Sequence, residues 1–260
     1  MTTPPEVRNP FLSPEGAGRY ARGRPYFPPL FMARLSPLLR GRAQGADVAC
    51  GTGLSSLALA DVVHEVRAFD LSAAMLAHAP AHPRITFARA PAEALPLPGA
   101  ALDVLTVAQA FHWVDRAAFM QEARRTLRPG GVLFVYDDFF VGQMSGQPGF
   151  AAFMSAYGER YPTPPRHRTP FGEADARAAG FDFHEERFTH TLPLTQAELV
   201  AYLLTHSNTL AATDSGRETT AQVRDWLEAG LRPFYPATGD QGTWRRDLHF
   251  LGWFMALRRG

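Results

Sequence analysis

Apolar and polar residues alternate along residues 46–137 in blocks of two kinds. Five short apolar runs predict buried strands, at 46–50, 65–70, 84–88, 102–108 and 132–137. Between them, apolar residues at helical spacing predict helices, at 54–62, 72–79 and 115–127. Strands that alternate with helices in this way predict an α/β fold, with a parallel sheet and helices on both faces.

The two ends of the chain follow less regular patterns. Residues 1–29 are rich in Pro, Gly and Arg with interleaved aromatic residues, which predicts an irregular arm before a helix at 30–40. In the second half, 141–150 and 162–170 are predicted loops with a short helix between them. Two further helices are expected near 195–206 and 217–229, and FHEERFTHTLPL and DLHFLGWFMALRR are expected as late strands.

We interpret the whole chain, 1–260, as one domain in three parts. Residues 1–40 form an N-terminal arm and helix, and 41–140 form the core. Residues 141–260 supply helical cap insertions and complete the sheet, without forming an independent domain.

Composition narrows the class of protein. Hydrophobic residues make up 46% and charged residues 20% of the chain, as in a soluble globular protein. The formal net charge of +1 favours neither nucleic acid nor an anionic membrane as a partner, and no segment approaches the length of a membrane span. Cys50 is the only cysteine, which excludes an intrachain disulfide, and with no apolar signal core in MTTPPEVRNP a cytoplasmic location is expected. The nine histidines show no metal-ligand spacing, so we expect no metal.

The stretch DVACGTG, 47–53, follows the first predicted strand and has almost no bulky side chain. Such a run loses burial and backbone entropy, which implies that a ligand comes close to its backbone at Gly51 and Gly53. Asp70 ends the second strand about 20 residues on, where a nucleotide-binding fold holds the ribose hydroxyls. NAD-like dinucleotides and S-adenosylmethionine (SAM) both fit this pattern.

Asp47 and Ser56 separate the two ligand classes. A dinucleotide needs a third glycine where this chain has Ser56, and its pyrophosphate would oppose the negative charge of Asp47. SAM has no phosphate and carries a cationic ammonium and a sulfonium, so an acid near the turn favours SAM.

Four segments of the chain together resemble one family: DVACGTG, VRAFDLSAAML, RAPAEALPLPGAALDVLTVAQAFHWVD and EARRTLRPGGVLFVYDD. The chain resembles class I SAM-dependent methyltransferases of the small-molecule type 11 branch over about 45–140, and YARGRPYFPP is similar to the arm that precedes their first strand. The resemblance implies a Rossmann-like, seven-stranded, mostly parallel sheet with an antiparallel last strand. It also implies SAM as cofactor and S-adenosylhomocysteine (SAH) as product.

The resemblance also implies a set of cofactor-binding residues: Asp47, Ala49, Gly51, Gly53, Asp70, Leu71, Ala92, Glu93 and Gln109. Ala49 stands where the family has its first glycine, and Pro91 stands where it often has an aspartate near the adenine amino group. Adenine recognition then falls to the backbone around Ala92 and to the Glu93 side chain.

The segment AQAFHWVD, 108–115, follows the central strand and faces the expected methyl group. Its candidate catalytic residues are Gln109 and His112, although His112 and Trp113 could instead form a packed pair that shapes the loop. Residues expected on the acceptor side or in a lid are Phe111, Trp113, Tyr20, Arg24 and Tyr26. Asp137 and Asp138 are interpreted as capping or solvated residues that end the fifth strand.

These features predict a cytoplasmic methyltransferase that acts on a small organic acceptor at oxygen, either a carboxylate or a hydroxyl. Only a hydroxyl acceptor needs a general base, and His112 is the first candidate for it. Two alternatives stay open: a non-catalytic SAM-binding regulatory or interaction protein, and an NAD(P)-dependent oxidoreductase. The sequence does not predict the identity of the acceptor or the oligomeric state.

Overall fold

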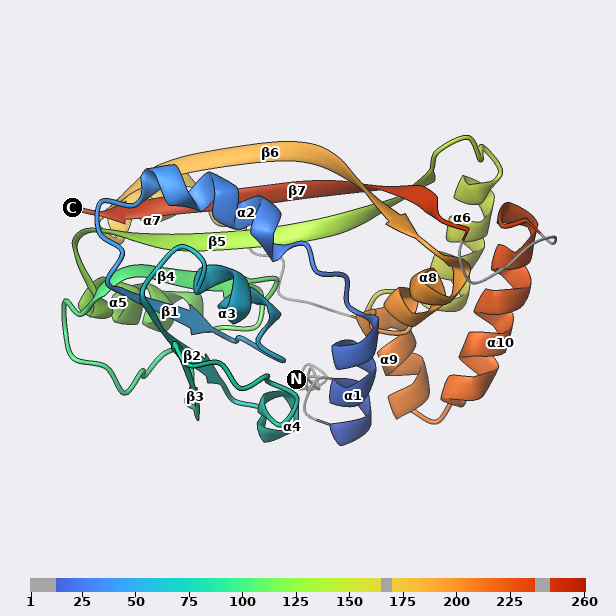
Figure 1. Cartoon of the computed structure of the whole chain (residues 1–260), viewed down its shortest axis with the longest axis horizontal. Helices are drawn as coiled ribbons and strands as arrows, with labels where there is room; N and C mark the ends of the chain where they lie inside the picture. The colour runs from blue at the N-terminus through green and yellow to red at the C-terminus, as the bar shows by residue number, and fades with distance from the viewer. Residues whose placement is uncertain (1–12, 165–169, 237–243) are drawn as a thin grey trace, which may run out of the picture. The chain divides into compact units, whose positions relative to one another are not determined.

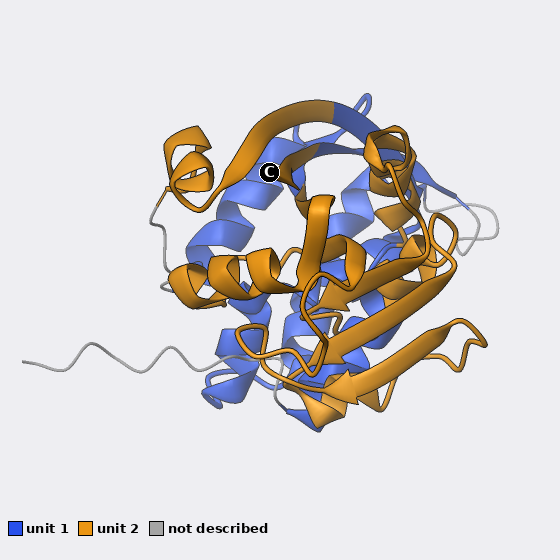
Figure 2. Cartoon of the chain, turned by 90° about the vertical axis from the view of Figure 1, so that its left-hand side faces the viewer, with its two compact units in different colours: residues 1–25, 139–166, 189–251 blue, residues 26–138, 167–188, 252–260 orange. Residues whose placement is uncertain are grey.

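The computed structural model describes residues 13–164, 170–236 and 244–260. The chain divides into two compact units (Figure 2). The first, here called the sheet unit, comprises 26–138, 167–188 and 252–260. The second, the helical unit, comprises 1–25, 139–166 and 189–251.

A seven-stranded sheet runs through the described residues in the order β3-β2-β1-β4-β5-β7-β6. Its strands are β1 (Gln44–Val48), β2 (Glu65–Asp70), β3 (Ile85–Arg89), β4 (Leu102–Ala108), β5 (Leu127–Met144), β6 (Phe181–Leu194) and β7 (Arg246–Arg259). The pairs β1–β2, β1–β4, β2–β3 and β4–β5 are parallel. Strand β7 runs opposite to its neighbours β5 and β6, because those two lead into the helical unit and β7 returns (Figure 1). The predicted mostly parallel sheet with an antiparallel last strand is confirmed.

Both faces of this sheet are buried in the sheet unit, which explains its near-continuous apolar strands. Its helices are α2 (Pro28–Leu35), α3 (Leu54–Leu59), α4 (Ala73–Leu76), α5 (Arg116–Thr126) and α7 (Glu173–Ala178), with a 3-10 turn η2 (Ser36–Leu38). Consecutive residues of β4 enter two different apolar clusters: Val104 packs in the cluster of α2 and α3, and Leu105 in the cluster of α5. Helix α5 begins after Asp115, whose side chain accepts a hydrogen bond from the Ala118 N–H, as predicted.

Strand β5 extends beyond its predicted range of 132–137 at both ends. It begins at Leu127, which was predicted as helix, and it reaches Met144, so 141–144 is strand and not loop. The prediction failed because Gly142 and Gln143 resemble loop residues. In the structure, Phe140 packs against Phe150 and Phe250, while Phe139 and Val141 on the opposite face are exposed. This alternation is that of a strand with one covered face.

The helical unit has its own apolar core. Its helices are α1 (Pro14–Gly23), α6 (Phe150–Arg160), α8 (Gln196–Leu203), α9 (Ser207–Asp214) and α10 (Thr220–Leu231), with a 3-10 turn η3 (Arg232–Phe234). Thr195 and Thr219 form capping boxes at the starts of α8 and α10, which confirms the two helices predicted there. Helix α9 was not predicted.

Helix α1 corrects the prediction of an irregular arm. Ser13 caps the helix by accepting a hydrogen bond from the Gly16 N–H, and Pro14 occupies the first turn, where its missing N–H does no harm. A Cβ on Gly23 would lie 2.3 Å from the Ala201 carbonyl oxygen, so this glycine allows a close approach of α1 to α8. Residues 1–12 of the predicted arm, like 165–169 of the predicted loop, lie outside the described residues.

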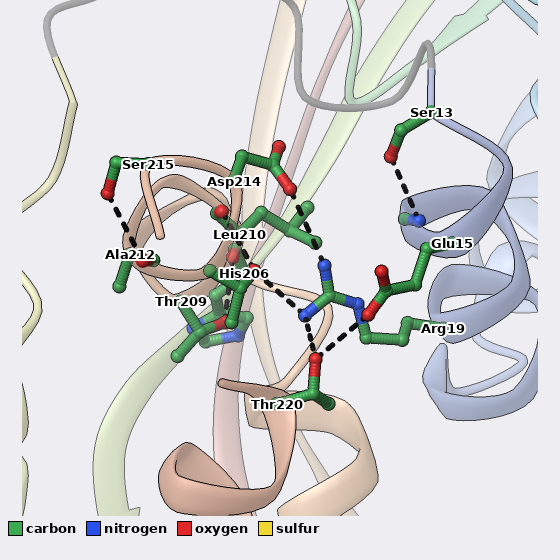
Figure 3. Close-up of polar contacts among 12 residues, drawn as sticks. Ser13, Glu15, Arg19, His206, Thr209, Leu210, Ala212, Asp214, Ser215 and Thr220 are labelled. Atoms are coloured by element: carbon green, nitrogen blue, oxygen red, sulfur yellow. Dashed lines mark hydrogen bonds and ion pairs between the residues drawn. The ribbon is translucent and has the colours of Figure 1, made fainter. Parts of the chain in front are cut away.

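A buried arginine fixes α1 within the helical unit (Figure 3). Arg19 is 7% exposed, and its Nη1 donates hydrogen bonds to Thr213 Oγ1 (3.0 Å) and Thr220 Oγ1 (3.2 Å). Its Nη2 lies 3.7 Å from an Asp214 carboxylate oxygen, and Thr220 also donates to Glu15. One guanidinium therefore joins α1 to α9 and α10.

Replacement of Arg19 by Met is expected to lower the free energy of unfolding by about 2–3 kcal/mol, because charge-assisted hydrogen bonds are lost and buried partners stay behind. The matched control is Arg22→Met, which removes an exposed arginine from the same helix and should change the value by less than about 0.5 kcal/mol. Urea denaturation measures both. Equal effects of the two variants would contradict the anchoring role of Arg19.

Candidate active site

A turn with three left-handed residues follows β1. The φ angles of Ala49, Gly51 and Gly53 are 53°, 57° and 83°. The Cys50 N–H donates to the Phe69 carbonyl (3.0 Å), and the Gly53 N–H donates to the Cys50 carbonyl (2.9 Å). The turn therefore has a fixed backbone path at the carboxyl end of the sheet, where open α/β sheets bind their ligands.

Space as well as conformation requires the two glycines. A Cβ on Gly51 would lie 3.0 Å from the Met75 methyl group, and a Cβ on Gly53 would lie 2.9 Å from the ring of Phe87. The methyl group can move, whereas the ring of Phe87 is held on β3. At both glycines the space that a Cβ would need is limited by the protein's own side chains, so the close approach of a ligand to this backbone stays a prediction.

Asp47 lies beneath the turn and is fully buried (0% exposed). Its Oδ2 accepts hydrogen bonds from the hydroxyls of Ser55 (2.5 Å) and Ser56 (2.7 Å), and its Oδ1 accepts one from Thr106 (2.8 Å). Burial raises the pKa of the Asp47 carboxyl group, the three hydroxyls lower it, and the charge of Asp70 raises it. The net result is a pKa of about 6. Any influence of Asp47 on a ligand therefore acts through the turn.

Asp70, at the end of β2, joins the turn from the other side. Its Oδ2 accepts a hydrogen bond from the Gly51 N–H (2.8 Å) and its Oδ1 accepts one from the Ser72 N–H (2.7 Å). Burial raises the pKa of this carboxyl group, while the Ser72 and Gly51 amides lower it. A carboxylate offers about four acceptor positions, so each oxygen retains capacity for a ligand hydroxyl. Leu71 beside it is 52% exposed.

The acceptor-side segment leaves the same edge of the sheet. Val48 of β1 pairs with Val107 of β4, so the glycine turn and the residues after Ala108 start at one level. Gln109 has a φ of 54°, unusual for a residue with a Cβ, and its Nε2 donates to the Asp138 carbonyl (2.9 Å). Asp138 is 3% exposed and lies within β5, so it neither ends this strand nor is solvated as interpreted.

His112 and Trp113 are half-buried neighbours in the loop after β4. Their ring centroids lie 4.9 Å apart at an interplanar angle of 45°. Phe111, in contrast, is 7% exposed and packs against Phe119 and Phe171. The structure therefore places Phe111 in the core and packs Trp113, with His112 beside it, against the same cluster. An acceptor-side role for His112 and Trp113 stays a prediction.

The two residues predicted near adenine differ in their surroundings. Ala92 is buried in the apolar cluster of α5. Glu93 is half-buried and accepts a hydrogen bond from the Asp115 N–H (2.8 Å), which connects its loop to the start of α5.

The predicted lid residues fall in two units. In the helical unit, the Arg24 guanidinium lies 5.4 Å from the Tyr20 ring centroid and 5.3 Å from that of Tyr202. Tyr26 belongs to the sheet unit and is 49% exposed. Closure of a lid by these residues stays a prediction.

Sequence reasoning missed the hydroxyls around Asp47. Ser56 was considered only as an absent glycine, and Ser55 and Thr106 carried no motif. The signal that could have found them is two consecutive serines in the first helical turn after a buried acid. Thr52, between the two glycines, was also missed; its buried Oγ1 has no hydrogen-bond partner among the described residues.

These residues fit SAM as the cofactor. The turn has left-handed residues and two positions without a Cβ, and Asp70 retains acceptor capacity for a ribose diol. Among the described residues no group of three or more His, Cys, Asp or Glu side chains could hold a metal ion. Within the same residues, no helix is long and apolar enough to cross a membrane.

We expect Gly53→Ala to lower the free energy of unfolding by about 2–3 kcal/mol, since left-handed strain adds to displacement of the Phe87 ring. Gly51→Ala should cost only about 1–2 kcal/mol, because the Met75 methyl group can move away. Denaturation of both variants checks the order. A larger loss for Gly51→Ala would contradict the described packing of the turn.

The chain is similar to known methyltransferases. A family model described as a methyltransferase domain matches residues 46–135. A relative described as a "Probable S-adenosylmethionine-dependent methyltransferase", from Mycolicibacterium smegmatis, is 39% identical over 102 residues, which are 37% of this chain and 40% of the relative. A malonyl-[acyl-carrier protein] O-methyltransferase of Enterobacter lignolyticus is 41% identical over 104 residues, which are 39% of this chain and 41% of that protein. The chain spans less than half the length of these curated relatives.

A solved structure is similar over nearly the whole chain. It is described as a "Putative Type II Methyltransferase" from Anaeromyxobacter dehalogenans, is 30% identical, and superposes with a TM-score of 0.63 over 90% of this chain and 96% of its own. The glycine turn, the acid after β2 and this likeness lead to one conclusion: the chain belongs to the class I SAM-dependent methyltransferases, in the type 11 branch, and its cofactor is SAM.

Proposed function

We propose that this enzyme transfers the methyl group of SAM to an oxygen atom of a small organic acceptor, a hydroxyl or a carboxylate. The observation that supports the position of the chemistry is the shared edge of β1 and β4. The glycine turn and the segment 109–113 leave adjacent parallel strands at one level, set by the Val48–Val107 pair. A cofactor on the turn and an acceptor beside His112 would then meet at this edge.

The proposed roles follow from the contacts of each side chain. Asp70 holds the ribose hydroxyls, and the turn from Ala49 to Gly53 accommodates the methionine part of the cofactor. The left-handed backbone of Gln109 and its bond to Asp138 fix the start of the acceptor-side loop. The bound cofactor supplies an activated methyl group, so the protein mainly aligns the reactants and excludes water.

Proton removal distinguishes the two oxygen acceptors. A hydroxyl must lose its proton during transfer, and His112, whose ring packs against Trp113, is our candidate base. A carboxylate has no proton to lose and needs no base. Support for oxygen as the acceptor atom comes from the partial similarity to the malonyl-[acyl-carrier protein] O-methyltransferase.

Transfer of labelled methyl groups from SAM to a panel of small hydroxyl, carboxylate and amine compounds tests the proposal. Labelled ethers or methyl esters are the expected products. A panel in which only amines are labelled would contradict oxygen as the acceptor atom and leave the enzyme class intact.

For a hydroxyl acceptor, His112→Asn should lower kcat about 100-fold with little change in SAH affinity, as expected when a general base is removed. With a carboxylate acceptor the same variant should change kcat less than about threefold, because no proton is transferred. His78→Asn, which replaces an exposed histidine that has no proposed role, serves as the control. Equal loss with both acceptor types would show a positioning role for His112 instead.

Asp70→Asn should weaken SAH binding at least tenfold, because a charge-assisted hydrogen bond to the ribose is worth about 1.5–3 kcal/mol. The amide oxygen retains one acceptor for the Gly51 or Ser72 N–H, so the fold should persist. Calorimetric titration with SAH, with NADH as the comparison ligand, measures the change. Unchanged SAH affinity would reject the ribose assignment.

A further inference from the structure

The buried carboxylate of Asp47 and the half-buried carboxylate of Asp70 flank the glycine turn, and no basic side chain in the described part of the chain pairs with either of them. Asp47 is surrounded by hydroxyls, and Asp70 by backbone amides. The groups that shift their pKa values include no Arg or His among the described residues. Both carboxylates also raise the pKa of Cys50, which lies in the turn between them, so their fields overlap there.

Carboxyl groups in such an arrangement ionise less readily than they do in water. In the protein without ligand, burial of Asp47 and the charge of Asp70 favour the protonated form of the Asp47 carboxyl group. A cation brought to the turn favours the ionised form. The cofactor carries such a charge: SAM has an ammonium and a sulfonium group, and SAH has the ammonium group.

We propose that cofactor binding is coupled to the release of a proton from the Asp47 carboxyl group to solvent. The O–H bond of the carboxyl group breaks, the proton passes to water or buffer, and the carboxylate keeps the hydroxyl bonds of Ser55, Ser56 and Thr106. Asp47 thus acts through its field and not by direct contact, as its burial requires. Linkage is reciprocal. If cofactor binding lowers the proton affinity of Asp47, then loss of that proton as the pH rises must raise the affinity for the cofactor.

The elements around Asp47 contribute few other titrating groups. Helix α3 contributes two serines, β4 contributes Thr106, and β2 contributes Asp70. Burial raises the pKa of the Cys50 thiol, which therefore stays neutral. Below pH 7 the α-amino group of the ligand stays protonated, so its own titration does not enter between pH 5 and 7. Histidines titrate in this range, and the comparison of the wild type with Asp47→Asn separates their contribution from that of Asp47.

Titration of the full-length protein with SAH, at pH 5.0–7.0 in buffers of different ionisation enthalpy, tests the coupling. We expect the association constant to rise about tenfold for each unit by which SAH lowers the pKa of Asp47. The complex should release the most protons where the pKa of Asp47, which burial raises well above its usual range, lies near the pH of the titration, and the release should fall towards higher pH.

Three variants separate Asp47 from the rest of the site. Asp47→Asn should bind SAH with markedly smaller proton release, and only the contribution of Asp70 should remain. Thr106→Val removes a hydroxyl that stabilises the carboxylate, so the pH dependence should move to higher pH. Asp61→Asn, an exposed aspartate, should behave as wild type.

Equal proton release by the wild type and Asp47→Asn would overturn the proposal. So would SAH affinity independent of pH between 5 and 7. Both readouts are binding measurements without an acceptor, so they stand apart from the proposal of oxygen methylation. If Asp47→Asn fails to fold, the shift expected for Thr106→Val still decides the question.

Discussion

A buried carboxylate with no basic partner among the described residues is the constraint on which the cofactor turn depends. Asp47 is held by hydroxyls from α3 and β4, and so it joins the first strand, the first helix of the core and the central strand. Hydroxyls stabilise the charge without neutralising it. An arginine in their place would cancel the negative field that favours a cationic ligand.

The same constraint extends to the acceptor side. Thr106, which binds Asp47, lies on β4 three residues before Gln109. Gln109 in turn binds the backbone of Asp138 on β5. Three adjacent strands are thus connected by side chains as well as by backbone pairing, near the carboxyl ends of β1 and β4 and within β5. The apolar clusters on the two faces pack against those strands, so the site stands on strands that are buried on both faces.

Hydrophobic patterning was sufficient for the core from 46 to 137, because parallel strands buried on both faces leave long apolar runs. It did not predict the elements of which only one face is buried. The extension of β5 past Asp138 has one covered face and includes Gly142, and α1 begins with Pro14 and contains three glycines. Both segments contain residues that are typical of loops, and they form a strand and a helix because they pack against neighbouring elements.

Within the site, sequence identified the residues of the motifs and not the direction of their side chains. Asp47 and Asp70 were both expected to contact the ligand, yet Asp47 faces the interior. Phe111 was expected beside the acceptor and packs in the core. The partners of Asp47 lie 8, 9 and 59 positions along the chain, so its hydroxyl environment depends on strand pairing that no local pattern reveals.

A crystal structure of the complex with SAH is the most direct test of the account. The account predicts both ribose hydroxyls on the Asp70 carboxylate, the methionine part of SAH along the turn from Ala49 to Gly53, and Asp47 still beneath the turn with its three hydroxyl bonds and no ligand contact. A complex in which SAH lies elsewhere, or in which the Asp47 carboxylate leaves its hydroxyls to contact the ligand, would contradict it.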